Sequence, residues 1–282
     1  MDSGILYITA TPMGNLEDMT FRAVRILKEA DLIAAEDTRH SKRLLSHYGI
    51  TTPCISCHEH NESQRAPQLI KRLEQGETIA LITDAGTPCI SDPGYVLVRE
   101  ASAKGIQVLP IPGCSAAVAG LSVAGLPTDQ FAFHGFLPKK QGRRTKALEA
   151  VKTDPATLIF YESPRRVITL IAHIKEVLGD RPACLAREIT KRHEEYIRGP
   201  LSQILEELEG RESVKGECAL FVQGADDSAL IPTEEDLESL VRAEVDAQPD
   251  TPTSALSKTL ATRFKVPKKQ IYNLILQLRE SR

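Results

Sequence analysis

A strand pattern, a turn-rich loop and a helix pattern follow one another at residues 78–103, and this succession constrains the fold more than any other segment. Residues 78–82 are apolar enough to predict a short buried strand, and residues 95–103 have helical spacing. The eleven residues from Asp84 to Gly94 contain two glycines, two prolines and two aspartates. In an open α/β sheet ligands bind at such loops, because glycines admit close approach and prolines hold one shape. An ordinary connection rich in turn residues has the same composition, so both interpretations stay open.

The same alternation of strand and helix patterns extends over the first 113 residues. The expected strands lie at residues 6–9, 32–35, 54–56, 78–82 and 107–109. The expected helices lie at residues 20–30, 38–47, 67–75 and 95–103. This alternation predicts an α/β fold with a mostly parallel sheet covered on both faces. The loops at residues 10–15 and 36–39 would then share the carboxyl edge of the sheet with the Asp84 loop, where crevices form.

A second α/β domain is predicted after residue 113, because Pro110–Gly113 interrupts the first pattern. New apolar runs lie at residues 131–133, 157–161, 183–186 and 218–222, with helix patterns at residues 164–178 and 201–208. Residues 194–199 could add an edge strand, which would make this sheet more mixed than the first. We therefore divide the body into an N-terminal domain, residues 1–113, and a second domain, residues 114–225.

The C-terminal part has a strongly uneven charge. Residues 226–250 carry nine acids and one base, which predicts an acidic linker, whereas residues 251–282 carry seven bases and one acid. Two helix patterns in residues 251–282 are joined by a short turn and resemble a helix-turn-helix module, with Lys268 and Lys269 opening the second helix. This module could contact nucleic acid, or it could be a plain helical hairpin packed on the body.

Composition predicts a globular protein without a membrane span. Hydrophobic residues make up 41% of the 282 residues, and no apolar run approaches the ~20 residues that a span needs. The N-terminus has no basic region ahead of an apolar stretch, so we expect a cytoplasmic protein. Cys54 and Cys57, followed by His58, have the spacing of a haem attachment site. Such attachment needs export and a structural zinc needs four ligands, so we expect reduced thiols and no metal.

Six ordered motifs resemble the tetrapyrrole-methylase superfamily and, more closely, its ribosomal RNA small subunit methyltransferase I group. They lie at residues 9–20, 35–39, 84–94, 112–116, 161–166 and 187–191, within a match from residue 5 to about residue 224. Corrin-pathway members have a more glycine-rich first loop and a Gly-Asp-Pro core in the second. This chain has Thr11–Gly14 and Asp84–Pro88 at those places. The departures point to the RNA branch rather than to a porphyrinoid substrate.

The resemblance implies two α/β domains with a cleft between them that holds S-adenosylmethionine. It implies cofactor contacts from Pro12, Asp84, Ala85, Gly86, Ser115, Ala116, Tyr161, Ala186 and Ala219. The implied activity is methylation of the ribose 2′-hydroxyl of a cytidine in the decoding region of 16S rRNA. The implied partners are that rRNA in the small ribosomal subunit and a second copy of the chain, as a homodimer.

A ribose hydroxyl is a poor nucleophile at neutral pH, so a general base or a cation near the forming alkoxide would help. Our catalytic candidates are Glu36, Asp37 and Lys191, with His58 a weaker one. Alternatively, Asp37 caps the helix that follows it and Arg39 pairs with a carboxylate.

RNA needs a basic rim on the protein, which would add affinity without sequence choice. The candidates for this rim are Arg39, Lys139, Lys140, Arg143, Arg144, Arg165, Lys268 and Lys269. Two other functions stay open: methylation of a small tetrapyrrole with the same cofactor, and a non-enzymatic nucleic-acid-binding protein that uses only its tail.

Overall fold

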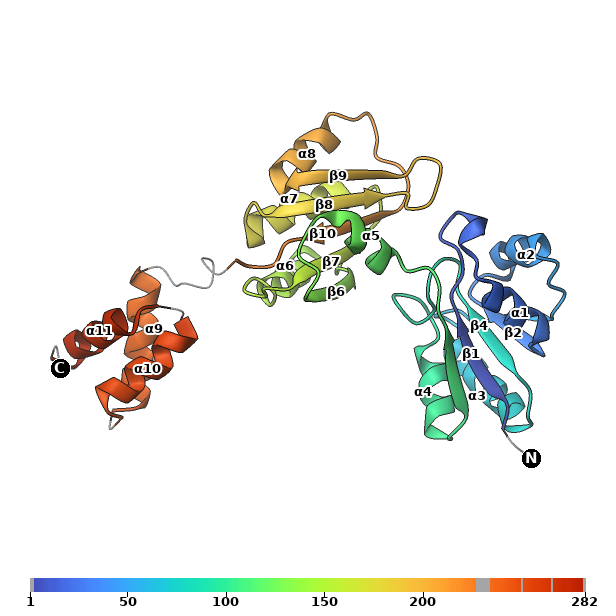
Figure 1. Ribbon diagram of the computed structural model, residues 1–282, viewed down its shortest axis with the longest axis horizontal. Coiled ribbons are helices and arrows are strands. Elements are labelled where there is room, and N and C mark those ends of the chain that lie inside the picture. Colours follow the sequence, from blue (N-terminus) through green and yellow to red (C-terminus); the bar gives the residue numbers. More distant parts are fainter. Residues whose placement is uncertain (1–2, 227–233, 250, 265, 281–282) are drawn as a thin grey trace.

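The computed structural model describes residues 3–226, 234–249, 251–264 and 266–280. Two α/β units and a group of three C-terminal helices follow one another along the chain (Figure 1). In the described part, no helix is both long and apolar enough to cross a membrane.

The first unit contains a five-stranded sheet in the order β3-β2-β4-β1-β5, and every neighbouring pair is parallel. Its strands are β1 (Ile5–Thr9), β2 (Leu32–Ala35), β3 (Cys54–Ser56), β4 (Ile79–Ile82) and β5 (Gln107–Ile111). Its helices are the 3₁₀ turn η1 (Leu16–Asp18), α1 (Phe21–Glu29), α2 (Thr38–His47), α3 (Glu62–Glu74) and α4 (Tyr95–Ala103). Leu69 of α3 and Leu97 of α4 are buried in one core, and Leu27 of α1 and Leu45 of α2 in another. Helices thus cover both faces of a parallel sheet, which confirms the α/β prediction.

The second unit contains a mixed sheet in the order β6-β7-β10-β8-β9. Its strands are β6 (Phe131–Phe136), β7 (Thr157–Glu162), β8 (Pro182–Arg187), β9 (Glu195–Pro200) and β10 (Cys218–Val222). Its helices are α5 (Ala116–Ala124), α6 (Gln141–Glu149), α7 (Val167–Leu178) and α8 (Leu201–Glu209). Strand β9 lies at the edge of the sheet and runs antiparallel to β8. An edge strand at this place was expected from the sequence.

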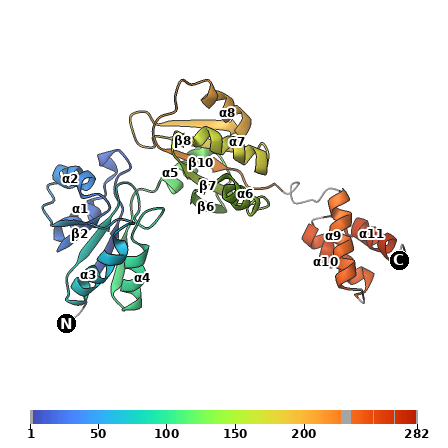
Figure 2. The same ribbon diagram turned by 180° about the vertical axis from the view of Figure 1, so that it is seen from behind.

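The two faces of the second sheet are covered unequally. One face packs against α6, α7 and α8 through residues such as Leu148, Leu170 and Ile204. The other packs against α5, the helix between the two units (Figure 2). Helix α5 lies close to the sheet because Gly120 faces the ring of Phe221, where a Cβ would overlap the ring. A single short helix leaves part of this face, next to the first unit, free to line a cavity.

The C-terminal group consists of α9 (Glu234–Ala247), α10 (Thr253–Phe264) and α11 (Lys268–Glu280). They share a core with Leu237, Val241 and Ile271 at its centre. The acidic linker expected at residues 226–250 therefore contains a packed helix, because Leu237, Val241 and Val245 recur every fourth residue among the acids. Residues 227–233 and 250 of that expected linker, and residues 265 and 281–282 of the expected module, lie outside the described residues.

Candidate functional site

A cavity of about 420 Å³ lies between the two α/β units, and we name it the interdomain cavity. The first unit lines it with the loops after β2, β4 and β5, and the second unit lines it with β7, β10 and the start of α5. Eight of the residues predicted from sequence lie in its wall: Glu36, Asp84, Ala85, Gly86, Ser115, Ala116, Tyr161 and Ala219. The structure thus brings together residues that are up to 183 positions apart, from Glu36 to Ala219.

Hydrogen bonds tie the Asp84 loop to the loops that follow β1 and β5. The backbone N–H of Thr11 donates to the carbonyl of Gly86 at 2.8 Å, and the N–H of Gly86 donates back to Thr11 at 3.0 Å. Gly86 has a φ of +86°, a left-handed conformation that favours glycine. The hydroxyl of Thr87 donates to the carbonyl of Cys114 at 2.9 Å. Three separate loops therefore form one connected edge of the interdomain cavity.

The far end of this loop is held by Glu62, a residue that sequence reasoning missed. Its Oε1 accepts hydrogen bonds from the backbone N–H groups of Gly94 at 3.0 Å, Val96 at 2.8 Å and Leu97 at 3.3 Å. Glu62 belongs to α3 and is 7% exposed. The residue before α4 is Gly94, which has no side chain to cap the helix. The sequence therefore indicated that another residue must cap α4, but not which one. A carboxylate from another helix therefore caps α4.

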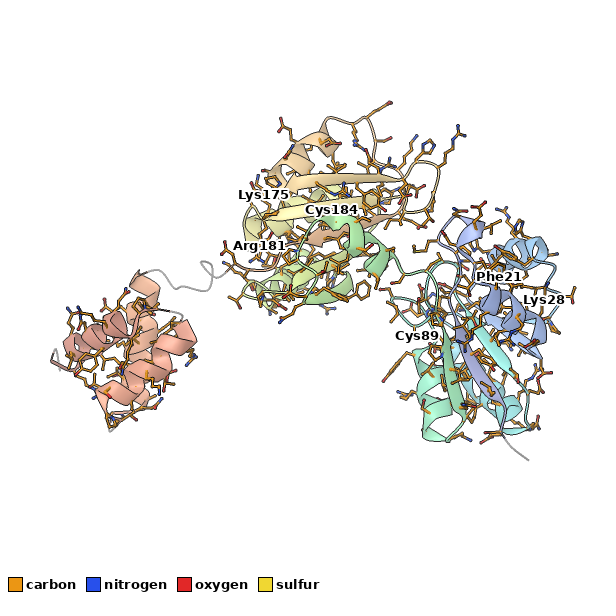
Figure 3. The ribbon with its side chains drawn as sticks, viewed as in Figure 1. Phe21, Lys28, Cys89, Lys175, Arg181 and Cys184 are labelled. Carbon is orange, nitrogen blue, oxygen red and sulfur yellow. The ribbon has the colours of Figure 1, made fainter. Side chains whose placement is uncertain are left out.

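Between these two anchors the loop has an unusual backbone. Cys89 and Ser91 have φ values of 70° and 66°, which are uncommon for residues other than glycine. Figure 3 shows Cys89 on the side of the first unit that faces the second. Such conformations persist only where surrounding contacts impose them, so the anchoring by Thr11 and Glu62 determines the loop shape.

Carboxylates gather at one side of the interdomain cavity. Glu36 Oε2 accepts a hydrogen bond from the Thr83 hydroxyl at 2.6 Å and one from the Asp84 N–H at 3.3 Å. Burial, and then the negative charge of Glu36, raise the pKa of Asp84. Burial also raises the pKa of Asp92 to about 6, and the negative charges of Glu36 and Asp84 act in the same direction. A group of this kind favours a cationic ligand.

Asp37 and Arg39 lie outside this cavity and form a helix cap. Asp37 Oδ1 accepts a hydrogen bond from the Arg39 N–H at 2.8 Å at the start of α2. The Arg39 guanidinium lies 3.0 Å from Asp37 Oδ2, and its hydrogen bond lowers the pKa of Asp37 to about 2. The capping alternative considered above is thus what the geometry shows. The structure brings Glu36, rather than Asp37, into the interdomain cavity.

Lys191 and Pro12 line a second, neighbouring cavity instead. The Lys191 ammonium lies 2.9 Å from Glu188 Oε1 and 3.1 Å from Glu217 Oε2. The aliphatic part of the Lys191 side chain covers Gly14, where a Cβ would overlap it. Lys191 is therefore an ion-paired residue of the second unit that packs on a loop of the first.

Ala186 does not line either cavity. It lies fully buried on β8 in the core beneath α5. Its neighbour across the sheet is Ala219, which does line the interdomain cavity. The placement of Ala186 at the cofactor, implied by the resemblance, is not reproduced by the geometry.

The predicted RNA residues have different environments. Lys139, Lys140, Arg143 and Arg165 are exposed on the second unit, and Lys268 and Lys269 are exposed at the start of α11. Arg144, in contrast, is half-buried and bound within the second unit, because its Nε donates a hydrogen bond to His173 Nδ1 at 2.7 Å.

The cysteines are all free thiols. Burial raises the pKa of Cys54 and of Cys57 to about 11. Among the described residues, no group of three or more His, Cys, Asp or Glu side chains could hold a metal ion.

Several cavity residues were absent from the sequence-based selection. They are Met13, Thr83, Thr87, Ile90, Ser91, Asp92, Phe136, Glu162, Ser163, Pro164, Ile189, Glu217 and Cys218. Asp92 lies in the loop that the sequence marked, so its acidic side chain was an available signal. Ile189 and Met13 are ordinary apolar residues, and only the folded arrangement of the two units distinguishes them from core residues.

Residues 6–205 match the family of Tetrapyrrole (Corrin/Porphyrin) Methylases. Solved structures with this fold include a diphthine synthase, with a TM-score of 0.62 and 15% identity over 79% of this chain and 90% of that one. They also include uroporphyrin-III C-methyltransferase from Thermus thermophilus complexed with S-adenyl homocysteine, with a TM-score of 0.53 and 18% identity over 77% of this chain and 96% of that one. The chain belongs to the tetrapyrrole (corrin/porphyrin) methylase family.

Its curated relatives carry a more particular name. A protein of Halalkalibacterium halodurans called Ribosomal RNA small subunit methyltransferase I is 47% identical over 98% of this chain and 96% of its own length. A protein of the same name from Pseudomonas aeruginosa is 50% identical over 79% of this chain and 80% of its own length. Another, from Bacillus subtilis, is 41% identical over 96% of this chain and 94% of its own length.

Proposed function

We propose that this chain is an S-adenosylmethionine-dependent methyltransferase of small-subunit ribosomal RNA. The proposed acceptor is the ribose 2′-hydroxyl of a cytidine in the decoding region of 16S rRNA. The observation that carries the proposal is the interdomain cavity, acidic and apolar, in a chain whose relatives are named Ribosomal RNA small subunit methyltransferase I.

The residues of the interdomain cavity fit this cofactor. S-adenosylmethionine is cationic at its sulfonium and its amino group, and Glu36, Asp84 and Asp92 supply negative charge on one side of the cavity. The half-buried ring of Tyr161 and the side chain of Met13 supply apolar surface for an adenine. The left-handed backbone of Gly86 and its tie to the first loop hold the cavity edge in one shape, which lowers the ordering cost of binding.

The main contribution of the protein to the reaction is to orient the cofactor and the acceptor relative to each other. The cofactor supplies an electrophilic methyl group, and the acceptor oxygen must lie in line with the bond that breaks. Glu36 is fixed by the hydroxyl of Thr83 and the N–H of Asp84. We assign it the role of accepting the proton that the ribose hydroxyl loses.

The exposed basic residues support an RNA substrate. Lys139, Lys140, Arg143 and Arg165 would contact phosphates from the second unit, and Lys268 and Lys269 would do so from the C-terminal helices. The proposal includes a cytoplasmic homodimer. Val118 and Val123 of α5, which are 58% and 43% exposed, offer it an apolar face.

Methyl transfer to ribosomal particles tests the proposal. The protein is incubated with methyl-labelled S-adenosylmethionine and 30S particles from a strain that lacks the corresponding enzyme. We expect label in 16S rRNA, at a ribose whose 2′-O-methyl group makes the adjoining phosphodiester resistant to alkali. Label in an added porphyrinoid but not in rRNA would support the small-molecule alternative. RNA binding by a protein that takes up no cofactor would support the non-enzymatic alternative.

A further inference from the structure

A second cavity of about 350 Å³ adjoins the interdomain cavity, and we name it the α2 cavity. The two cavities share a wall made by Met13, Thr83, Asp84, Ala85 and Glu217. Beyond that wall the α2 cavity extends along α2 and under the first loop of the chain. A molecule in it would therefore reach the place where the two cavities meet.

The two cavities differ in charge. The interdomain cavity is lined by Glu36, Asp92 and Glu162, which its neighbour lacks. The α2 cavity has the basic side chains His40, Arg43 and Lys191 in its wall instead. A cationic cofactor and an anionic acceptor would thus be separated, with the transfer point between them.

Among these three bases, Arg43 is the one available to a ligand. The Lys191 ammonium is paired with two carboxylates, and His40 Nδ1 lies 3.6 Å from Asp84 Oδ1. No ion pair is formed by Arg43 with any other residue that the structure describes, and its side chain is exposed. A guanidinium in this state suits a phosphate, because its N–H groups match two phosphate oxygens.

Ser41 gives the second and independent indication of a ligand. It lines the α2 cavity and is only 2% exposed, yet its hydroxyl has no hydrogen-bond partner in the described part of the chain. Its backbone N–H is satisfied within the helix by the carbonyl of Asp37 at 2.9 Å. Leaving a buried hydroxyl unpaired is unfavourable, so a polar ligand atom that fills this place is favoured.

Apart from the shared wall, the three bases and Ser41, the rest of the α2 cavity lining is apolar. Pro12, Leu16 and Leu44 provide surface that a flat ring can cover. The volume is of the size that single small ligands occupy, about 300–1,000 Å³. Enzymes that act on one nucleotide of a structured nucleic acid commonly take that nucleotide out of its stack into such a pocket.

We propose that the α2 cavity binds one unstacked nucleotide of the acceptor strand. Its base lies against Leu16 and Leu44 and forms a hydrogen bond with the Ser41 hydroxyl. Its phosphate is bound by Arg43, and its ribose faces the shared wall and the interdomain cavity. This inference rests on the proposed function, and it adds the place of the acceptor and the residues that select a nucleotide.

Matched substitutions on α2 test the inference. Arg43→Gln removes from the α2 cavity the guanidinium that forms no ion pair among the described residues, and Lys42→Gln removes a neighbouring cation that lines neither cavity. Likewise, Ser41→Ala removes the unpaired hydroxyl, and Ser46→Ala removes an exposed one on the same helix. Each full-length variant is assayed for kcat/KM with 30S particles, for 30S affinity by filter binding, and for S-adenosylmethionine affinity by equilibrium dialysis.

We expect Arg43→Gln to lower kcat/KM by about 10-fold to 100-fold and to weaken binding of 30S particles, with a reduced salt dependence. Ser41→Ala should lower kcat/KM by about 5-fold or more. The two control variants should stay within about twofold of the wild type, and all four should bind S-adenosylmethionine as the wild type does.

Two results would overturn the inference while leaving the proposed function intact. One is transfer to rRNA at the wild-type rate by both Arg43→Gln and Ser41→Ala. The other is a loss of S-adenosylmethionine affinity as large as the loss of transfer, which would assign the α2 cavity to the cofactor. A wild-type protein that binds the cofactor but labels no rRNA would instead overturn the proposed function, and the inference with it.

Discussion

The two α/β units contribute to the interdomain cavity in different ways. The first unit contributes loops at the carboxyl ends of parallel strands, and hydrogen bonds such as those between Thr11 and Gly86 connect the loops. The second unit contributes the face of a mixed sheet, with Tyr161 on β7 and Ala219 on β10, where α5 does not cover it. Loops can change shape without disturbing a core, whereas a sheet face belongs to the core. The two halves of the site should therefore respond differently to the same kind of substitution.

The largest effect is expected when a leucine replaces an alanine in either wall. Ala85→Leu and Ala219→Leu should each weaken S-adenosylmethionine binding by about 100-fold, or about 2.7 kcal/mol, because the added atoms occupy the cavity. Ala219 is 4% exposed in a packed cluster, so Ala219→Leu should also lower the free energy of unfolding by about 1–3 kcal/mol. Ala85→Leu should change stability by less than about 0.5 kcal/mol. Equilibrium dialysis and urea unfolding measure the two quantities.

The exposed Ala103 at the end of α4 provides the matched control. Ala103→Leu should leave cofactor affinity and stability unchanged. We call the side of the cavity formed by the loop at Ala85 the loop wall, and the side formed by the strands at Ala219 the sheet wall. If Ala85→Leu destabilised the protein as much as Ala219→Leu, the distinction between these two walls would be wrong.

Substitution of Glu62 tests whether the loop wall depends on its anchor. Glu62→Gln removes the charge that three backbone N–H groups and the start of α4 face. We expect the free energy of unfolding to fall by about 1–2 kcal/mol. The KM for S-adenosylmethionine should rise several-fold with little change in kcat, because the loop is less well ordered before binding.

The exposed Glu59, just before α3, serves as the control for this experiment. Glu59→Gln should match the wild type in stability and in KM. An unchanged KM in Glu62→Gln, despite lower stability, would limit Glu62 to a purely structural role.

The acidic side of the cavity predicts a pH dependence of cofactor binding. Because the pKa of Asp92 is raised to about 6, its carboxyl takes up a proton as the pH falls through that value. The attraction for a cation is then lost below about pH 6 and present above it. From about pH 7.5 to about pH 5, S-adenosylmethionine affinity should fall about fivefold, as expected for one partly screened charge contact of about 1 kcal/mol.

Two comparisons isolate this effect in calorimetric titrations. S-adenosylhomocysteine lacks the sulfonium charge, so its affinity should change less over the same range. Asp92→Asn should remove the dependence that the wild type shows. A pH dependence that persists in Asp92→Asn would assign it to Asp84, whose pKa is also raised.

The smallest effect is expected at Asp37, outside the cavity. Asparagine caps a helix about as well as aspartate, so Asp37→Asn should keep methyl transfer within about twofold of the wild type. Glu36→Gln should reduce transfer more, because Glu36 lines the interdomain cavity. The reverse order of the two rates would identify Asp37 as the residue that acts on the acceptor.

The loop wall could be predicted from the sequence because its residue types are distinctive. Glycine, proline and aspartate concentrate in the Asp84 loop, and strand patterns before each loop fix where the loop emerges. The sheet wall depended on the resemblance, because Tyr161 and Ala219 are indistinguishable by type from core residues. Ala186 illustrates this: it lies next to Ala219 across the sheet but is buried in the core.

Other features could not be predicted from the sequence because they depend on contacts between segments that are far apart in the chain. Glu62 and Gly94 are 32 residues apart, and no local pattern indicates that one caps the helix after the other. Helix α9 was expected as part of an acidic linker because residues 226–250 carry nine acids and one base, and its apolar residues lie among those acids. Those residues, Leu237, Val241 and Val245, are nevertheless spaced to pack on α10 and α11.

Cys218 contributes to the wall of the interdomain cavity, and its side chain packs in the core on the opposite face of the sheet from Ala219. A methyl sulfonium reacts with any strong nucleophile within reach, and a thiolate is a far better nucleophile than a ribose hydroxyl. Burial raises the pKa of Cys218 to about 12, so at neutral pH almost all of it is the unreactive thiol. Because this strand residue is buried, we expect its sulfur not to compete with the intended acceptor for the methyl group.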